Sequence, residues 1–439
     1  MSDAAAAGAD PAATTVADPP PTHRITVLIG FDAGVRAGVA FVVGLLVARY
    51  LGPAAFGTLA LAIAVVTVLL PLGGLGTDSI LIQRLAEHGP TSPRSQALLR
   101  AASSVRVAGA VITAVAALGF AAFRSPTEAL AIVLVAPALL AAPFEMGWGW
   151  VLASGHVGTL VGIRFAITVV AAAARLCVIG LDGGVPALAA ITGLEILSLA
   201  VAATLVARYQ GARLAARPSS RRAMLRESLP LLASGLFFLV MLRVDLFLVD
   251  LTLGPEETGR YAAVTRFAEA TYLVASVAVA AAAPRIIAAH RAGSTEYRVA
   301  YRRLLRQFLV LAVGLALVLS IIAAPLVQVL LGDAFVPAAP VLAVYAWSAV
   351  PVFLGTARDR LAIDLAITQT SVVNTMAGAV LNVVLNLVLL PRIGLVGAGI
   401  ATLVSYTAMI TVIPALDRRQ RPVNDVLASA VLPTRVAEP

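Results

Sequence analysis

Long apolar runs follow one another along almost the whole chain, and they restrict the possible folds more than any other feature. Twelve of them reach the length that a helix needs to cross a bilayer. They cover residues 25–48, 55–82, 97–122, 127–153, 157–180, 186–208, 229–252, 259–286, 305–330, 335–357, 369–391 and 394–416. Hydrophobic residues make up 60% of the 439 residues, against roughly 45–50% in soluble proteins. The sequence therefore predicts an all-α, polytopic membrane protein.

A short motif occurs twice and indicates an internal duplication. Leu51-Gly52-Pro53 and Leu253-Gly254-Pro255 are separated by 202 residues, and at this offset Gly57 also aligns with Gly259. Both copies lie between two apolar runs, as expected for a repeated membrane unit. We therefore expect two six-helix lobes, at 24–212 and 213–417, between a disordered N-terminal tail (1–23) and a C-terminal tail (418–439).

Arginines alternate between the connections and indicate the orientation. The connections that follow the second, sixth, eighth and last runs hold most of them, and such basic loops usually face the cytoplasm. We therefore expect both termini and both tails to be cytoplasmic. The net charge of +9 then reflects topology, and a nucleic-acid partner is not expected.

Several classes of function find little support in the sequence. The single cysteine, Cys177, excludes intramolecular disulfides and multi-cysteine metal sites. The four histidines fall in the tail or at predicted helix ends, and no outer loop is long enough to form a catalytic domain. We predict no catalytic residue, no metal site and no cofactor, while coupling to protons or sodium stays open.

Charged residues inside the apolar runs are the functional candidates, because burying charge in a membrane is costly. In the first run, Asp32 and Arg36 are four residues apart and share a helix face. Gly30, Gly34 and Gly38 lie on the opposite face, where we expect them to pack against a neighbouring helix. A self-neutralised structural pair is an equally good interpretation of Asp32 and Arg36.

The fifth run carries Arg164 and Arg175, which are about three helical turns apart and so form a cationic face. Their alternative role is to form salt bridges with Glu145 of the fourth run and Glu195 of the sixth. We favour a functional role for Arg175 and a structural one for Arg164.

The hairpin formed by the seventh and eighth runs places Asp245 level with Arg266, and Arg243 level with Glu269. Residues two apart on a helix point in nearly opposite directions, so both pairs cannot form equally well. One of these charges should be left facing the interior.

Three asparagines of the eleventh run, Asn374, Asn382 and Asn386, share one broad helix face. They form either a polar wall of a transport path or hydrogen bonds between helices, and the second role is commoner.

Four segments resemble the oligosaccharide flippases of polysaccharide biosynthesis, whose superfamily, called MOP, also contains the MATE multidrug exporters. They are ARYLGPAAFG at 48–57, RVDLFLVDLTLGPEETGRYAAVTRFAE at 243–269, LLGDAFVPAAPVLAVYAW at 330–347 and LNVVLNLVLLPRIGLVGAGIATLVSY at 381–406. The resemblance covers about 24–417. The pattern of asparagines and glycines in the last segment is the most specific.

The resemblance implies a MATE-like, twelve-helix transporter in the bacterial cytoplasmic membrane. It would flip a polyprenyl-diphosphate-linked oligosaccharide from the inner to the outer leaflet by alternating access between the lobes. Membrane lipids, a polysaccharide polymerase and glycosyltransferases would be its partners. We expect Arg36, Arg175, Arg243 and Arg266 to bind the diphosphate.

Alternatives remain open, because the acids within the runs are as numerous as the arginines. In a cation- or proton-coupled drug exporter of the MATE type, Asp32, Asp245 or Glu269 would bind the coupling ion. A membrane enzyme of glycan assembly and a scaffold without transport are less well supported, because the chain lacks a catalytic pattern and a scaffold needs no deep charges.

Overall fold

The computed structural model describes residues 22–212, 221–292, 294–364, 369–421 and 423–425, and every regular element in these ranges is a helix. In the first half of the chain the elements are α1 (Thr22–Gly74), α2 (Thr77–His88), α3 (Pro93–Ala121), α4 (Pro126–Val135), η1 (Ala136–Ala141), α5 (Ala142–Ser154), α6 (Gly158–Gly180) and α7 (Val185–Tyr209). In the second half they are α8 (Arg221–Leu253), α9 (Pro255–Ala292), α10 (Ser294–Leu331), η2 (Asp333–Ala338), α11 (Ala339–Tyr345), η3 (Ala346–Ser348), α12 (Ala349–Asp364), α13 (Gln369–Ile393), α14 (Leu395–Ile410), α15 (Val412–Ala415) and η4 (Arg418–Gln420).

The first two predicted runs are joined in α1, which changes direction at Gly52. This residue has a φ of 71° and a ψ of 173°, so two helices meet there. The predicted end of the second run at 82 is wrong, because the helix stops at Gly74 and α2 begins at Thr77. Leu75 and Gly76 between them have φ values of 50° and 68°. Such left-handed residues cannot continue a right-handed helix.

The fourth and tenth runs, which occupy equivalent places in the two halves, are both broken by 3₁₀ turns. The kink expected from the prolines of the tenth run is confirmed, since η2 and η3 flank α11 there. In the fourth run, η1 separates α4 from α5 and contains Pro137. Proline lacks a backbone N–H and so interrupts the hydrogen bonding of an α-helix.

The length and apolar character of the helices fit a multi-pass membrane protein. Ten segments of the described chain are long and apolar enough to cross a membrane. The first of these, Leu28–Gly74, has 47 residues and contains both halves of α1. With α1 counted twice and the 33-residue α8 added, the described residues contain the twelve expected helices.

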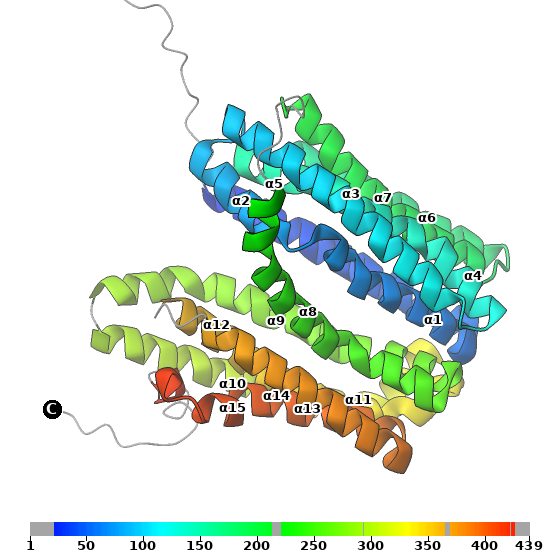
Figure 1. The fold of residues 1–439 in the computed structure, drawn as a ribbon. Helices are drawn as coiled ribbons and strands as arrows, with labels where there is room; N and C mark the ends of the chain where they lie inside the picture. Colours follow the sequence, from blue (N-terminus) through cyan, green and yellow to red (C-terminus); the bar gives the residue numbers. More distant parts are fainter. Residues whose placement is uncertain (1–21, 213–220, 293, 365–368, 422, 426–439) are drawn as a thin grey trace, which may run out of the picture.

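The helices form two bundles, one from α1 to α7 and the other from α8 to α15 (Figure 1). The boundary predicted at 212/213 borders residues 213–220, which lie outside the description, as do nearly all of 1–23 and most of 418–439. The exact limits of the lobes and the cytoplasmic position of both termini therefore stay predictions.

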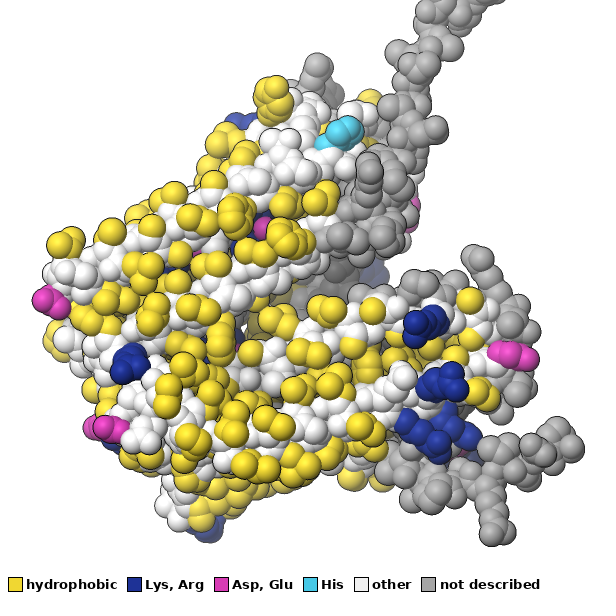
Figure 2. Space-filling view, turned by 180° about the vertical axis from the view of Figure 1, so that it is seen from behind, with side chains coloured by type: hydrophobic (Ala, Val, Ile, Leu, Met, Phe, Trp, Pro, Cys, Tyr) yellow, Lys and Arg dark blue, Asp and Glu magenta, His cyan; other side chains and the backbone are white. Residues whose placement is uncertain are grey.

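The two bundles share a hydrophobic core at one end and have separate cores at the other. Phe56 of α1 and Tyr261 of α9 belong to one cluster that runs through both bundles. Toward the other end, Trp150 belongs to a cluster of the first bundle together with Met224 of α8, and Tyr301 belongs to a cluster of the second. Figure 2 shows the cleft that opens between the bundles at this second end.

A very close approach of the bundles involves equivalent glycines of the two repeats. A Cβ at Gly57 would overlap the Pro255 carbonyl oxygen and lie 2.8 Å from the Gly259 nitrogen. A Cβ at Gly259 would overlap the Pro53 carbonyl oxygen and lie 2.8 Å from the Gly57 nitrogen. Reciprocal contacts of this kind mark a two-fold axis. The pseudo-symmetry axis of the duplication therefore passes between Gly57 and Gly259.

Candidate functional site

A cavity of about 650 Å³ lies where the bundles meet, with walls from α1, α6, α7, α8 and α9. Most of its lining is small or apolar. The ionisable side chains of the lining are Arg175, Glu195, Arg243, Arg266 and Glu269. The structure thus brings three of the four arginines expected to bind substrate into one cavity, together with Glu269.

Arg175 of α6 is neutralised within its own bundle. Its Nη2 donates to Glu195 Oε2 of α7 at 2.6 Å and to Thr192 Oγ1 at 3.2 Å. Consecutive antiparallel helices place these side chains at the same depth, which is why Glu195 could be proposed as a partner from the sequence. The pair contributes no net charge to the cavity.

Arg243 and Glu269 form the second ion pair of the cavity, with Nη1 and Oε1 3.3 Å apart. Asp245, two residues along α8, faces away from it. Its carboxylate accepts hydrogen bonds from the Tyr261 hydroxyl at 2.5 Å and from the Leu246 backbone N–H at 2.8 Å. Only one of the two pairs expected in this hairpin is therefore formed.

Arg266 has no carboxylate within ion-pair distance in the described part of the chain. Its guanidinium crosses from α9 to α1, where Cζ lies 5.0 Å from the ring centroid of Phe56. It also fills the space beside Gly44. Arg266 is therefore the charge that the hairpin leaves for the interior.

Asp32 and Arg36 lie in the first bundle and outside the lining of the cavity. Asp32 Oδ2 is 3.2 Å from Arg36 Nε and 3.8 Å from Arg164 Nε. The Arg164 guanidinium also stacks on Trp148, with Cζ 4.6 Å from the ring centroid. The structure places Arg36 in a cluster with Asp32 and Arg164, away from the other three predicted arginines.

The expected packing of the glycine stripe is wrong. A Cβ at Gly30, Gly34 or Gly38 would have no neighbour within 4 Å, and Gly34 and Gly38 line the cavity. The side of α1 that carries the glycines thus faces open space. The side that carries Asp32 faces Arg164 of α6.

The three predicted asparagines are buried and belong to two separate hydrogen-bond groups. Asn374 exchanges hydrogen bonds with Gln420, at 2.9 and 3.2 Å. Asn386 donates to Asn382 Oδ1 at 3.1 Å, and Asn382 donates to Thr402 Oγ1 at 3.4 Å. None of the three is among the cavity residues, so hydrogen bonding between helices is the role that the structure shows.

The second group ends at a buried carboxylate. Thr402 Oγ1 lies 3.5 Å from Asp245 Oδ2, and Asn386 Oδ1 is buried without a hydrogen-bond partner in the described ranges. The hydroxyls of Tyr261 and Thr402 therefore both lie beside one carboxylate oxygen, Asp245 Oδ2. Among the described residues, no cluster of three or more His, Cys, Asp or Glu side chains could hold a metal ion.

Sequence reasoning missed Arg106, which is fully buried in α3. It donates to Thr77 Oγ1 at 2.8 Å, to the Ala142 carbonyl at 3.1 Å and to Asp78 Oδ1 at 2.5 Å. These bonds hold the start of α2 against α3 and α5. The available signal was an arginine inside the third apolar run.

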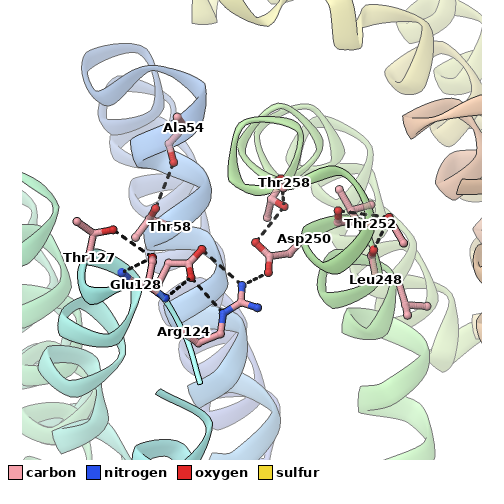
Figure 3. A network of polar contacts seen from close by, with 12 residues as sticks. Ala54, Thr58, Arg124, Thr127, Glu128, Leu248, Asp250, Thr252 and Thr258 are labelled. Atoms are coloured by element: carbon pink, nitrogen blue, oxygen red, sulfur yellow. Dashed lines mark hydrogen bonds and ion pairs between the residues drawn. The ribbon is translucent and has the colours of Figure 1, made fainter. Parts of the chain in front are cut away.

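Sequence reasoning also missed an ion pair between the bundles at their joined end. Arg124, which follows α3, pairs with Asp250 of α8 and lies 3.2 Å from Glu128 of α4 (Figure 3). Asp250 Oδ1 in turn lies 3.5 Å from the hydroxyl of Thr258 on α9. In the sequence, Arg124 lies in a predicted outer loop between two apolar runs. Its partner could not be predicted, because the sequence does not show which residues meet across the bundles.

Comparisons with known proteins agree with this architecture. The inward closed conformation of the lipid II flippase MurJ has a TM-score of 0.72 at 10% identity, over 92% of this chain and 91% of that one. An inward-facing MATE-family multidrug transporter of the MOP superfamily has a TM-score of 0.64 at 14% identity, over 91% and 99%. An outward-facing transporter of the same family has a TM-score of 0.57 at 14% identity, over 93% of this chain and 98% of that one.

These neighbours share the fold of the chain. No curated protein sequence matches the chain. The family model described as polysaccharide biosynthesis protein matches residues 28–290, which is more than half of the chain. The chain therefore belongs to the polysaccharide biosynthesis protein family.

Proposed function

We propose that the protein flips a polyprenyl-diphosphate-linked oligosaccharide from the inner to the outer leaflet of the bacterial cytoplasmic membrane. The observation that carries the proposal is the position of Arg266. Its guanidinium lies in the cavity between the bundles and forms no ion pair with a carboxylate of the described chain. Both termini would be cytoplasmic, and the cleft would open to the cytoplasm. A polysaccharide polymerase and glycosyltransferases would act on the same lipid-linked glycan.

The charge balance of the cavity favours an anionic headgroup. Arg175 is offset by Glu195 and Arg243 by Glu269, so Arg266 leaves one positive charge. A diphosphate that leaves water needs fixed cations, and a guanidinium can hold phosphate oxygens with two parallel hydrogen bonds. A cationic drug would find both cavity acids already paired, which makes the drug-exporter alternative less favourable.

The family and the fold support the same proposal. The matched family is that of polysaccharide biosynthesis, and the neighbour with a TM-score of 0.72 is a flippase of a lipid. A diphosphate headgroup would enter the cleft while the polyprenyl chain stayed in the bilayer. The small and apolar lining would then let the sugars pass with few fixed contacts.

We further propose that Asp245 couples transport to protons or sodium. Asp245 is 3% exposed, its carboxylate lies close to the oxygens of Tyr261 and Thr402, and no arginine of the described chain is in ion-pair contact with it. A buried carboxylate with oxygen neighbours can take up a proton or hold a hard cation. Asp32 and Glu269, the other proposed coupling residues, each have an arginine partner.

Replacing Arg266 tests the substrate proposal. Arg266→Ala should reduce flipping by about 10- to 100-fold, the effect of losing one charge-assisted hydrogen bond to phosphate. The flipping rate of Arg266→Lys should lie between those of Arg266→Ala and the parent, because lysine keeps the charge but lacks the planar guanidinium. Flipping is measured in proteoliposomes with a fluorescent polyprenyl-diphosphate oligosaccharide and a membrane-impermeant quencher.

In the structure, Asp245 does not depend on Arg266 for a partner, although the sequence places the two residues at the same level. Asp245 is bonded to Tyr261, so removing Arg266 strands no carboxylate, and the loss of thermal stability should be limited to the contacts of Arg266 with Phe56 and Gly44. Arg392→Ala is the matched control, since Arg392 is exposed and bonds the Val388 carbonyl of its own helix. Equal flipping by Arg266→Ala and this control would contradict the proposal.

A further inference from the structure

The position of the Arg266 guanidinium ties the two bundles together inside the cavity. Arg266 belongs to α9, whereas Gly44 and Phe56 belong to α1. A Cβ at residue 44 would overlap Arg266 Nη1 and lie 3.2 Å from Cζ, so the guanidinium fills the place where a side chain would begin. Phe56 covers it from a second direction. We call Gly44 and Phe56 the arginine seat.

The backbone does not explain the glycine at position 44. Gly44 lies inside a helix and has no positive φ, and glycine in a helix interior costs roughly 0.5–1 kcal/mol relative to alanine. Gly34 and Gly38, on the same wall of the cavity, have no neighbour within 4 Å of the place that a Cβ would take. The close contact with Arg266 therefore distinguishes Gly44 from these two glycines.

The seat departs from the internal symmetry of the chain. At the offset of 202 residues, Gly44 corresponds to Leu246 and Arg266 corresponds to Ala64. The equivalent contact between the bundles thus does not exist in the other repeat. Gly57 and Gly259 keep the symmetry at the joined end, while the cationic contact occurs on one side only, inside the cavity.

We propose that the diphosphate headgroup releases Arg266 from the seat and so breaks a contact that holds the two bundles together. A guanidinium that moves to phosphate oxygens elsewhere in the cavity would leave its contacts with Phe56 and Gly44. A ligand shifts a conformational equilibrium only through different affinities for its two states. Competition for one guanidinium supplies such a difference.

The seat acts in transport only if Arg266 binds the headgroup, so it rests on the function proposed above. It adds a cost to binding, because part of the affinity for diphosphate is spent on leaving Phe56. Gly44 and Phe56 are then positioning residues for Arg266. Emptying the seat by mutation should make diphosphate bind more tightly and should loosen the bundles without ligand.

Gly44→Ala places a methyl group where the Arg266 guanidinium lies and so displaces the guanidinium from the seat. The overlap is with the far end of a flexible side chain, which can move while the fold is kept. Gly38→Ala is the matched control, because it adds the same methyl to the same helix and cavity wall without touching another group. Phe56→Leu removes the aromatic face at similar bulk and serves as a second test of the seat.

Two measurements report whether Arg266 occupies the seat. The first is the dissociation constant of farnesyl diphosphate for the purified protein, with farnesol as the uncharged comparison. The second is the distance between spin labels at Ala86→Cys on α2 and Val299→Cys on α10, in a Cys177→Ser background. Both label sites are exposed and lie near the open end of the cleft.

Gly44→Ala should bind farnesyl diphosphate roughly 2- to 30-fold more tightly than Gly38→Ala, the range that a cation–π contact corresponds to. Its ligand-free distances should shift toward those of the ligand-saturated parent. Equal affinity and equal distances in Gly44→Ala and Gly38→Ala would overturn the seat, and so would weaker binding by Gly44→Ala. Unchanged binding by Arg266→Ala would instead overturn the proposed function itself.

Discussion

At the scale of single residues, the pairing of each buried charge decides what that residue can do. Arg175 and Arg243 are held by glutamates, and Arg266 lies against an aromatic ring and a glycine. Asp32 is shared by two arginines, whereas Asp245 is bonded to a hydroxyl and a backbone N–H. Arg266 and Asp245, which have no ion-pair partner among the described residues, are therefore the best candidates for binding ligand and ion.

Asp245→Asn should uncouple flipping from the ion gradient while leaving the fold intact. The asparagine oxygen can accept the hydrogen bond of Tyr261, while its amide group replaces the oxygen that accepts from the Leu246 N–H, so the cost to stability should be about 1–3 kcal/mol. Flipping driven by an imposed sodium or proton gradient is measured in proteoliposomes. The variant should show the same rate with and without the gradient.

Asp32→Asn is the comparison for this prediction. It removes the partner of Arg36 and Arg164, and leaving buried charge unpaired is costly. We expect it to lower thermal stability more than Asp245→Asn does. A gradient dependence that survives in Asp245→Asn and disappears in Asp32→Asn would move the coupling site to the first bundle.

At the scale of helices, the sequence predicts elements well where local chemistry determines them. Spanning length and apolar content locate the helices, and the prolines of the tenth run predict its kink. The break at Leu75 and Gly76 was not predicted, because the apolar run continues through it. Arg106 fixes this break from another helix, and hydropathy along the chain does not contain that information.

The glycine contact between α1 and α9 leads to a prediction at the same scale. Gly57→Ala should destabilise the joined end by about 1–3 kcal/mol, the usual cost of overpacking, because its methyl meets backbone atoms that cannot rotate away. Gly259→Ala should have a similar effect, since the two contacts are reciprocal. Both variants should shift the protein toward a state in which this end is open.

The shift is measured as the distance between spin labels at Leu181→Cys and Ile393→Cys, one exposed site in each bundle. Gly119→Ala is the control, because a Cβ there has no neighbour within 4 Å. Gly57→Ala should broaden the distribution toward longer distances. A distribution identical to that of Gly119→Ala would show that the glycine contact does not hold this end closed.

At the scale of the whole molecule, contacts within a hairpin could be predicted and contacts between the bundles could not. The turn at Gly254 sets the register of α8 and α9, so counting residues predicts the pairing of Arg243 with Glu269 as one of two possible pairs, but not which of the two forms. The pairing of Arg124 with Asp250 joins bundles whose relative position no local pattern encodes. The arginine seat was missed for the same reason.

The bundles are joined by a shared core at one end and separated by a cleft at the other. In the proposed mechanism this is the state open to the cytoplasm. Alternating access requires the joined end to open and the cleft to close, and the cavity that holds Arg266 then faces the other side of the membrane. In this mechanism, one cavity is reached from each side of the membrane in turn.

The most direct test follows a single cavity residue from both sides of the membrane. Ala270→Cys, in a Cys177→Ser background, places a thiol in the cavity lining, and a membrane-impermeant maleimide is applied to inside-out or right-side-out vesicles. Without substrate, we expect labelling only from the cytoplasmic side. Added polyprenyl-diphosphate oligosaccharide should make the same thiol reactive from the outer side. Labelling that stays confined to one side with substrate present, or that occurs equally from both sides without it, would contradict transport by alternating access.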